Sequence, residues 1–145
     1  MASRDGDDPR RHVPDPARRC APPGRTGGNG ALVAVSSTSA MHGAGGNEAY
    51  GTSKTALVGL VRALAVSLGH HQIRVNALLP GWAKTELAGP AYDHERFRNG
   101  MIRRTPLSRW AEPSEMSAAA VFLCDPATSF HTGDALVIDG GYTVF

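Results

Sequence analysis

The apolar residues of this chain form three short runs that are separated by helical patterns. The runs are Ala31–Val35, Ile73–Leu79 and Ala135–Ile138, and Gly, Pro, Ser or Asp residues follow each of them. Short, mostly apolar runs are typical of strands buried on both faces, although Arg74 and Asn76 interrupt the second run. The chain thus alternates strand, helix, strand, helix, strand, and helical crossovers of this length predict parallel strands with right-handed connections.

The longest helix is predicted from Glu48 to Leu68, with Gly69 as its stop. One face follows the i, i+3, i+4, i+7 rule and predicts a core stripe of Leu57, Leu60, Val61, Leu64 and Leu68. The opposite face carries small uncharged residues, namely Ala56, Gly59, Ala63 and Val66. A helix that is apolar on both sides is expected to be buried on both sides, which predicts a homo-oligomer through this helix.

A second helix is expected to begin at Pro113 and to end at Asp125-Pro126. Its predicted core face consists of Met116, Ala119, Ala120 and Leu123, and Cys124 is expected to be a small core residue. Residues 82–108 are polar with scattered aromatic side chains, which predicts an irregular or partly helical flap.

Residues 1–30 differ from the rest of the chain. They contain five prolines and five glycines and almost no apolar side chains, so they cannot offset the entropy cost of ordering. We therefore predict a disordered tail at 1–30 and an ordered α/β domain at 31–145.

Charge and composition exclude several classes of protein. The chain has 15 basic and 13 acidic residues. Six of the basic and four of the acidic residues lie in residues 1–30, so the remainder has nine of each. This balanced body has no basic footprint for nucleic acid. No apolar run is long enough to span a membrane, and no secretory signal is visible. Two cysteines and six histidines without ligand spacing predict no disulfide framework and no metal site, and favour the cytoplasm.

Chemically useful side chains are predicted at one edge of the sheet. Tyr50 and Lys54 lie one turn apart on the same helical face, and a neighbouring ammonium favours the deprotonated form of a tyrosine. Ser37 follows the first strand, and Pro80-Gly81 follows the second. In open α/β sheets ligands bind beyond the carboxyl ends of the strands, so Ser37, Tyr50 and Lys54 are expected to converge on one small molecule.

The ordered set of these motifs resembles the short-chain dehydrogenase/reductase family over about Gly28 to Tyr142. Three motifs follow one another in the order that the family shows. They are the strand that ends at Ser36-Ser37, the Tyr50-x-x-x-Lys54 pair, and Ile73-Arg74-Val75-Asn76-Ala77 with Pro80-Gly81 and Thr85. The segments Pro106–Arg109, Glu112–Glu115 and Thr132–Gly141 resemble the entry to its late helix and its closing strand. The resemblance implies a partial Rossmann-like fold.

The family's chemistry implies NAD or NADP as cofactor and a small alcohol or carbonyl substrate. Tyr50 would be the general acid/base, and Ser37 would position the substrate. Tyr50 and Lys54 would also contact the cofactor, with Lys54 on the nicotinamide ribose. In the cofactor-binding turn, which also includes Pro80 and Gly81, the backbone of Ala83 and the side chain of Thr85 would meet the nicotinamide carboxamide.

The chain also departs from the family pattern. The family begins with a strand and a Gly-rich turn that cradles the pyrophosphate, and nothing similar precedes Ser37 here. The resemblance therefore implies the second half of the fold, truncated at its N-terminus. Two functions follow as expectations: an oxidoreductase of this family, or a non-catalytic fragment that acts through self-association or by pairing with a full-length relative.

Overall fold

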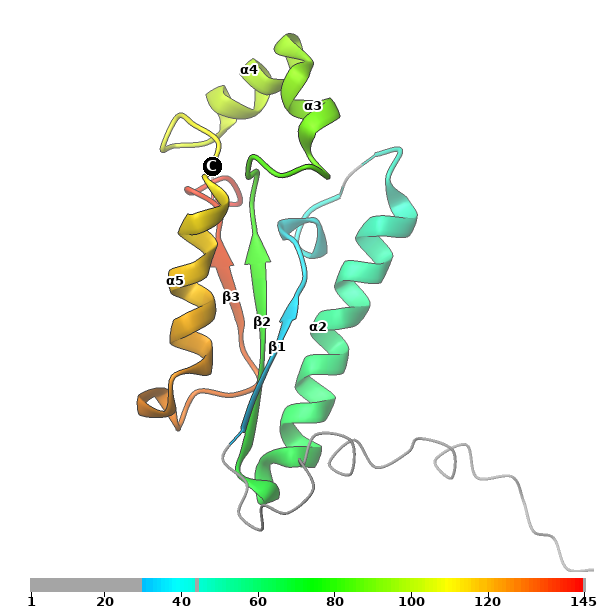
Figure 1. Ribbon diagram of the computed structural model, residues 1–145. Coiled ribbons are helices and arrows are strands. Elements are labelled where there is room, and N and C mark those ends of the chain that lie inside the picture. Colours follow the sequence, from blue (N-terminus) through cyan, green and yellow to red (C-terminus); the bar gives the residue numbers. More distant parts are fainter. Residues whose placement is uncertain (1–29, 44, 145) are drawn as a thin grey trace, which may run out of the picture.

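The fold is a three-stranded parallel sheet between two long helices (Figure 1). The computed structural model describes residues 30–43 and 45–144. The α/β class with three parallel strands and crossover helices is confirmed. Of the predicted tail, only Gly30 falls within the described residues, where it begins the first strand; residues 1–29 lie outside them.

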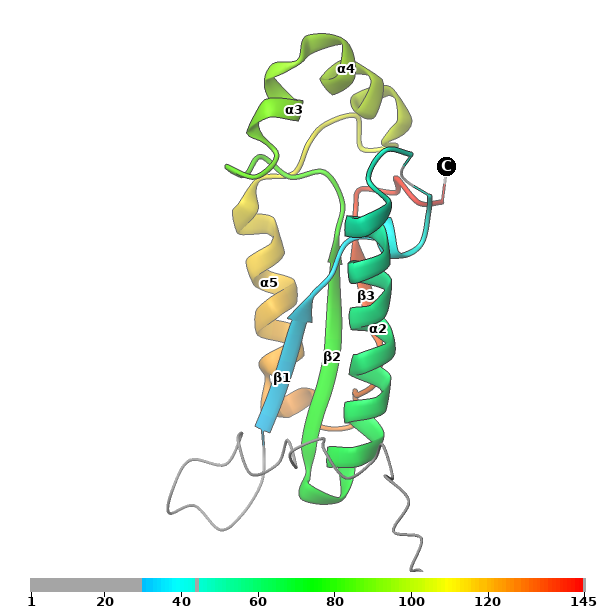
Figure 2. The ribbon, with the colours of Figure 1, turned by 90° about the vertical axis from the view of Figure 1, so that its right-hand side faces the viewer.

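The strands are β1 (Gly30–Val35), β2 (Ile73–Pro80) and β3 (Ala135–Ile138). Their order in the sheet is β1-β2-β3, with Leu32 opposite Val75 and Ala77 opposite Ala135. Helices α2 and α5 cover opposite faces of this sheet (Figure 2). The first and third strands are therefore edges among the described residues, and β2 is the centre of the molecule.

Strand β2 separates two halves of the core through its alternating side chains. Val75, Ala77 and Leu79 belong to the cluster under α2, whereas Leu78 belongs to the cluster under α5. The prediction of a strand buried on both faces is confirmed for β2. It is wrong for β1, whose Val35 side chain is 57% exposed, because a strand at the sheet edge has a neighbour on only one side.

Helix α2 spans Glu48–Leu68, as predicted. Val61 and Leu68 are buried on the sheet together with Ala65, which the predicted core stripe omitted. Leu60 is 51% exposed, so its place in that stripe is wrong. The stripe that meets the sheet is narrower than the apolar pattern, because α2 packs on the centre of a sheet only three strands wide.

The end of α2 differs from the expected glycine stop. Gly69 keeps right-handed helical angles, and the chain continues into a short 3-10 turn, η3 (Gly69–His71). The left-handed residue is instead Gln72, with φ of 58°. Because Gly69 donates its N–H to the Ala65 carbonyl, the helical path continues until Gln72 reverses it into β2.

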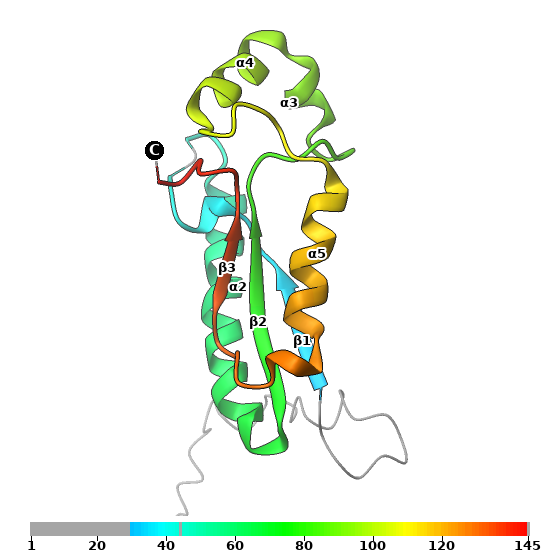
Figure 3. The ribbon, with the colours of Figure 1, turned by 90° about the vertical axis from the view of Figure 1, so that its left-hand side faces the viewer.

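The flap of residues 82–108 is partly helical, which is one of the two forms predicted for it. It contains α3 (Gly89–Asp93) and α4 (Glu95–Arg104), which stand beyond the carboxyl ends of the strands (Figure 3). Aromatic contacts connect it to the body: the Trp82 ring lies 5.0 Å from Trp110 and 5.2 Å from Phe97, and Tyr92 lies 5.2 Å from Trp110. The flap thus packs on the body through aromatic side chains, and the main-chain bridge of Ala83 with Ala111 also joins them.

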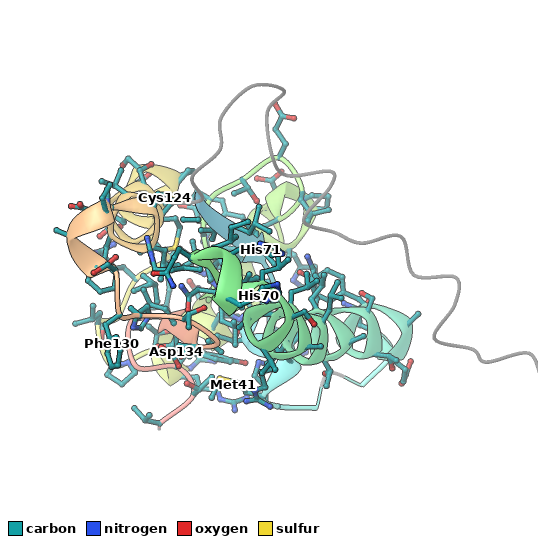
Figure 4. The ribbon with its side chains drawn as sticks, turned by 90° about the horizontal axis from the view of Figure 1, so that it is seen from below. Met41, His70, His71, Cys124, Phe130 and Asp134 are labelled. Carbon is teal, nitrogen blue, oxygen red and sulfur yellow. The ribbon has the colours of Figure 1, made fainter. Side chains whose placement is uncertain are left out.

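Helix α5 spans Pro113–Cys124, with Pro113 at its first position and a 3-10 turn, η4 (Pro126–Thr128), after it. Its predicted core face is confirmed, with Ala119 and Leu123 buried and Met116 and Ala120 partly buried. Cys124 is exposed at the end of the helix, so its prediction as a core residue is wrong (Figure 4). No helix in the described part of the chain is long and apolar enough to cross a membrane.

The turn after β2 requires a glycine at position 81. The Gly81 N–H donates to the Ile138 carbonyl, which brings the turn against the end of β3. A Cβ at this position would lie 2.7 Å from both Cα and Cβ of Asp139, closer than side chains tolerate. The turn after β2 can therefore pack against Asp139 at the end of β3 only because residue 81 has no side chain.

We expect Gly81→Ala to lower the free energy of unfolding by about 1–3 kcal/mol, because the methyl group forces β3 away from the turn. Gly59→Ala is the matched control, since a Cβ there would meet nothing within 4 Å. That change should raise stability by about 0.5–1 kcal/mol through helix propensity. Denaturant unfolding measures both values, and equal effects of the two changes would contradict the close approach at Gly81.

An ion pair fixes the start of α5. Both carboxylate oxygens of Glu115 accept hydrogen bonds from the Arg109 guanidinium at 2.7 Å, and one also accepts from the Glu112 N–H. The hydrogen bonds from Arg109 first, and from the Glu112 backbone second, lower the pKa of Glu115 from 4.5 to about 2. Both side chains are partly exposed, so solvent screens this pair.

The lowered pKa of Glu115 predicts a defined pH dependence of stability. Its contribution is fully present above pH 4.5 and is lost as the pH falls through about 2, because the unfolded chain takes up the proton first. The difference in unfolding free energy between the native chain and Glu115→Gln should therefore be constant above pH 4.5 and shrink towards pH 2. Arg109→Gln should produce the same pattern, and a difference that grows on acidification would contradict the pairing.

Candidate active site

The candidate site begins where β1 ends. The Ser36 N–H donates to the Leu78 carbonyl at 2.8 Å and extends the pairing of β1 with β2 by one residue. Ser37 then caps the short 3-10 helix η2 (Thr38–Ala40), because its Oγ accepts from the Ser39 N–H at 3.1 Å. The hydroxyl hydrogen of Ser37 is not used in that bond and can donate to a ligand.

Tyr50 and Lys54 lie on the first turns of α2, at the same end of the sheet as η2. The Lys54 Nζ is 5.5 Å from the centroid of the Tyr50 ring, and both side chains are half-buried. The main chain of Ser39 lies close to Gly51, since a Cβ on Gly51 would be 3.7 Å from the Ser39 carbonyl oxygen. The structure thus brings the two helical residues next to the segment that contains Ser37.

Two reciprocal hydrogen bonds hold this arrangement together. The Ser36 Oγ donates to the main-chain carbonyl of Lys54 at 2.8 Å, and the Lys54 Nζ donates to the main-chain carbonyl of Val35 at 3.0 Å. The Lys54 ammonium is therefore directed to the carboxyl end of β1 and keeps two further N–H groups. Sequence reasoning chose Ser37 and did not identify Ser36, although the Ser-Ser pair after an apolar strand was visible.

The turn after β2 lies at this end of the sheet as well. Ala83 pairs with Ala111 through the Lys84 N–H and the Trp82 carbonyl, which leaves the Ala83 N–H outside that bridge. Thr85 is exposed, and its Oγ1 accepts from the Ala88 N–H at 3.3 Å. Pro80, Gly81, Ala83 and Thr85 therefore follow one another along the edge where Ser37 and Tyr50 lie.

Asp139 closes the opposite side of this turn. Burial acts to raise the pKa of its carboxyl group, but hydrogen bonds from the Thr143 hydroxyl and from the Thr143 and Gly141 N–H groups outweigh burial and hold the pKa below its ordinary value. Asp139 thus remains an acceptor for its own turn. It has a structural role beside Gly81 and was not among the predicted site residues.

Trp110 is a second residue that sequence reasoning did not identify. It is only 2% exposed and lies at the centre of the aromatic contacts of the flap, yet its indole N–H has no hydrogen-bond partner among the described residues. Within the described ranges no group of three or more His, Cys, Asp or Glu side chains is arranged to hold a metal ion. Beside the end of β1, the candidate groups are the hydroxyls of Ser37 and Tyr50 and the ammonium of Lys54.

Known proteins share much of this sequence. A family model described as enoyl-(acyl carrier protein) reductase matches residues 15–143. A tropinone reductase homolog of Arabidopsis thaliana is 37% identical over 120 residues, which are 83% of this chain and 46% of the relative. The 5-keto-D-gluconate 5-reductase of Escherichia coli K12 is 41% identical over 95 residues, 66% of this chain and 37% of the relative.

A solved structure shows the same fold. The gluconate 5-dehydrogenase of Burkholderia cenocepacia J2315, in complex with NADP and tartrate, superposes with a TM-score of 0.79 at 29% identity. The match covers 81% of this chain and 46% of that protein. The chain thus spans about half the length of the relatives it matches, and within that span motif, fold and sequence agree. It belongs to the short-chain dehydrogenase/reductase family.

Proposed function

We propose that the protein takes part in NAD(P)-dependent interconversion of an alcohol and a carbonyl compound. The observation that supports this proposal is the junction of β1 and α2, where Lys54 lies 5.5 Å from the Tyr50 ring centroid and donates to the Val35 carbonyl. The junction places a phenol, an ammonium and the Ser37 hydroxyl at the carboxyl end of a parallel sheet, where such folds bind ligands. The substrate is a small alcohol or carbonyl compound.

Tyr50 is the general acid/base in this proposal. In the reducing direction it donates a proton to the carbonyl oxygen of the substrate, and in the oxidising direction it accepts one from the alcohol. Ser37 donates its free hydroxyl hydrogen to the same oxygen and orients it. Lys54 supplies positive charge beside the phenolate that Tyr50 becomes after proton transfer.

The residues present also fit the nicotinamide end of a cofactor. The Ala83 N–H lies outside the bridge with Ala111, and the exposed Thr85 hydroxyl can donate, so both can contact a carboxamide. The free N–H groups of Lys54 suit ribose hydroxyls. The cofactor, when bound, supplies or takes up the hydride. The Gly-rich turn that holds the pyrophosphate in this family has no counterpart in the sequence before Ser37.

The second candidate function is association without catalysis. The face of α2 that points away from the sheet is apolar, with Val66 84% exposed, and Arg62 is its only charge between Thr55 and Leu68. Exposed apolar surface of this kind is typical of a subunit interface. We propose that α2 pairs two copies of the chain, or one copy with a full-length relative. This function needs no cofactor.

Cofactor binding decides between the two functions. The purified 145-residue chain is titrated with NADH and with NADPH, and nicotinamide fluorescence is followed. We expect saturable binding of one of them. If neither binds at millimolar concentration, the chain is not an independent oxidoreductase, and association remains as its function.

Tyr50→Phe tests the assigned proton transfer. The change keeps the ring and Lys54, so cofactor binding should weaken little. The rate of reduction of 5-keto-D-gluconate, used as a trial substrate, should fall by roughly 10²–10⁴-fold. Thr55→Ala on the same helix is the matched control, because its hydroxyl bonds only to the Gly51 carbonyl among the described residues. An unchanged rate in Tyr50→Phe would contradict the role of Tyr50.

Association through α2 is tested by placing a charge on its exposed face. By size-exclusion chromatography with light scattering, the native chain should show a mass near twice the 15.3 kDa of one copy. Val66→Glu should give single chains, because burial of an unpaired carboxylate is unfavourable. Val121→Glu introduces the same charge on α5, at a position that is also exposed, and should leave the dimer intact. A monomeric native protein would exclude self-association.

A further inference from the structure

The C-terminal turn, residues 139–144, lies between the flap and the segment that carries Ser37 (Figure 3). In this turn the Tyr142 side chain is 3% exposed, whereas Val144, two residues later, is 87% exposed. A large aromatic ring can be buried at such a place only if neighbouring elements cover it. The elements that cover Tyr142 belong to two different parts of the molecule.

Helix α4 of the flap covers one side of the Tyr142 ring. The Arg104 guanidinium lies 4.4 Å from the ring centroid, and the face of an aromatic ring attracts a cation at this distance. The Tyr142 hydroxyl donates to the Met101 Sδ at 3.7 Å. Met101 and Arg104 are three residues apart and therefore share one face of α4. The ring is thus attached to the last turns of the flap helix.

His42 contacts the same ring from the side of the candidate active site. Its imidazole meets the Tyr142 ring edge to face, with 5.4 Å between the ring centroids. The His42 N–H donates to the Thr38 carbonyl at 3.3 Å, so His42 is attached to η2. Ser37 caps η2 with its side chain, and its carbonyl accepts from the Ala40 N–H at 3.0 Å. One aromatic contact therefore connects Tyr142 to the turn that positions the Ser37 hydroxyl.

Hydrogen bonds fix the main chain that carries Tyr142. The Tyr142 N–H donates to the Asp139 carbonyl at 3.2 Å. The Asp139 carboxylate accepts from the N–H groups of Gly141 and Thr143 at 2.9 and 2.8 Å. A buried ring on a fixed turn has little space to move independently of the groups packed on it. A displacement of α4 is therefore expected to reach His42 through the ring.

We propose that Tyr142 is a positioning residue that couples the flap to Ser37. A shift of α4 passes through the Arg104 contact to the Tyr142 ring, and from the ring through His42 to η2. The coupling is a property of the folded chain and needs no ligand. Its meaning for catalysis rests on the proposed function, in which Ser37 orients the substrate oxygen.

Amide hydrogen exchange, followed by nuclear magnetic resonance without cofactor or substrate, measures the coupling. The readout is the Met41 amide, which donates to the Thr38 carbonyl at 2.9 Å at the end of η2. Arg104→Gln weakens the contact with the ring and should speed this exchange by roughly two- to fivefold. Arg103→Gln removes the same charge from the next residue, which is also exposed, and should leave the rate unchanged. An unchanged Met41 rate in Arg104→Gln, or an equal change at the Leu123 amide of α5, overturns the proposal.

Variants at the middle of the pathway separate the coupling from a direct effect of charge. In Tyr142→Leu the exchange of Met41 should be faster, and adding Arg104→Gln should have no further effect. Tyr142→Phe keeps both ring contacts and should behave as the native chain does. If Tyr142→Leu does not fold, His42→Ala removes the other contact and should likewise cancel the effect of Arg104→Gln. An effect that persists in either background overturns the proposal, because it then does not pass through Tyr142.

Positioning of Ser37 predicts that two substitutions depend on each other. Arg104→Gln should lower the rate of reduction of 5-keto-D-gluconate by roughly two- to fivefold in the native chain. It should have no effect in Ser37→Ala, where no hydroxyl remains to be positioned. An equal loss in both backgrounds overturns the positioning of Ser37. The exchange measurements are made without nicotinamide cofactor, so they decide the coupling independently of the proposed oxidoreductase function.

Discussion

The candidate site depends on the junction between the carboxyl end of β1 and the first turns of α2. There a strand-end side chain, Ser36, bonds to the helix main chain, and a helix side chain, Lys54, bonds to the strand main chain. Each bond contributes roughly 1 kcal/mol to stability, which is modest. Their larger effect is positional, because a helix is rigid over one turn and fixing Lys54 also fixes Tyr50. The same contact therefore sets both halves of the proposed proton relay relative to Ser37.

The opposite end of the sheet uses its polar side chains differently from the site. Arg74 and Asn76 of β2 are buried there, and both donate to the main-chain carbonyl of His131. Arg74 also donates to the carbonyl of Asp125. These bonds attach the loop between α5 and β3 to the sheet, away from the site. The Asn76 side chain also accepts from the Asp134 N–H. This network satisfies the polar groups of Arg74 and Asn76 within the fold, whereas the Ser37 hydroxyl hydrogen beyond Val35 is not used in its capping bond.

Periodicity predicted the elements of the fold and the end of the sheet at which the site lies. Helix α2 and strand β3 have the predicted bounds, and the motif residues follow the carboxyl ends of their strands. The predictions of burial for Leu60 and Cys124 were wrong, because burial depends on which elements pack around a residue in space. Both residues have apolar neighbours in the sequence but face solvent, since a three-stranded sheet covers only part of each helix. The local pattern could not distinguish Ser36 from Ser37, and Trp110 carries no distinctive pattern. The importance of both comes from contacts with residues farther along the chain.

Exposed apolar surface connects the proposed chemistry with the proposed association. Parallel strands are usually covered on both faces, whereas α2 packs on β2 and leaves Val35 at the edge of β1 exposed. The uncovered face of α2, with Val66, continues along the helix whose first turns carry Tyr50 and Lys54. A partner that covers this face would stabilise the helix as a whole and therefore the junction at its start. The proposed association and the proposed proton transfer are thus compatible on one helix, and the first would strengthen the geometry on which the second depends.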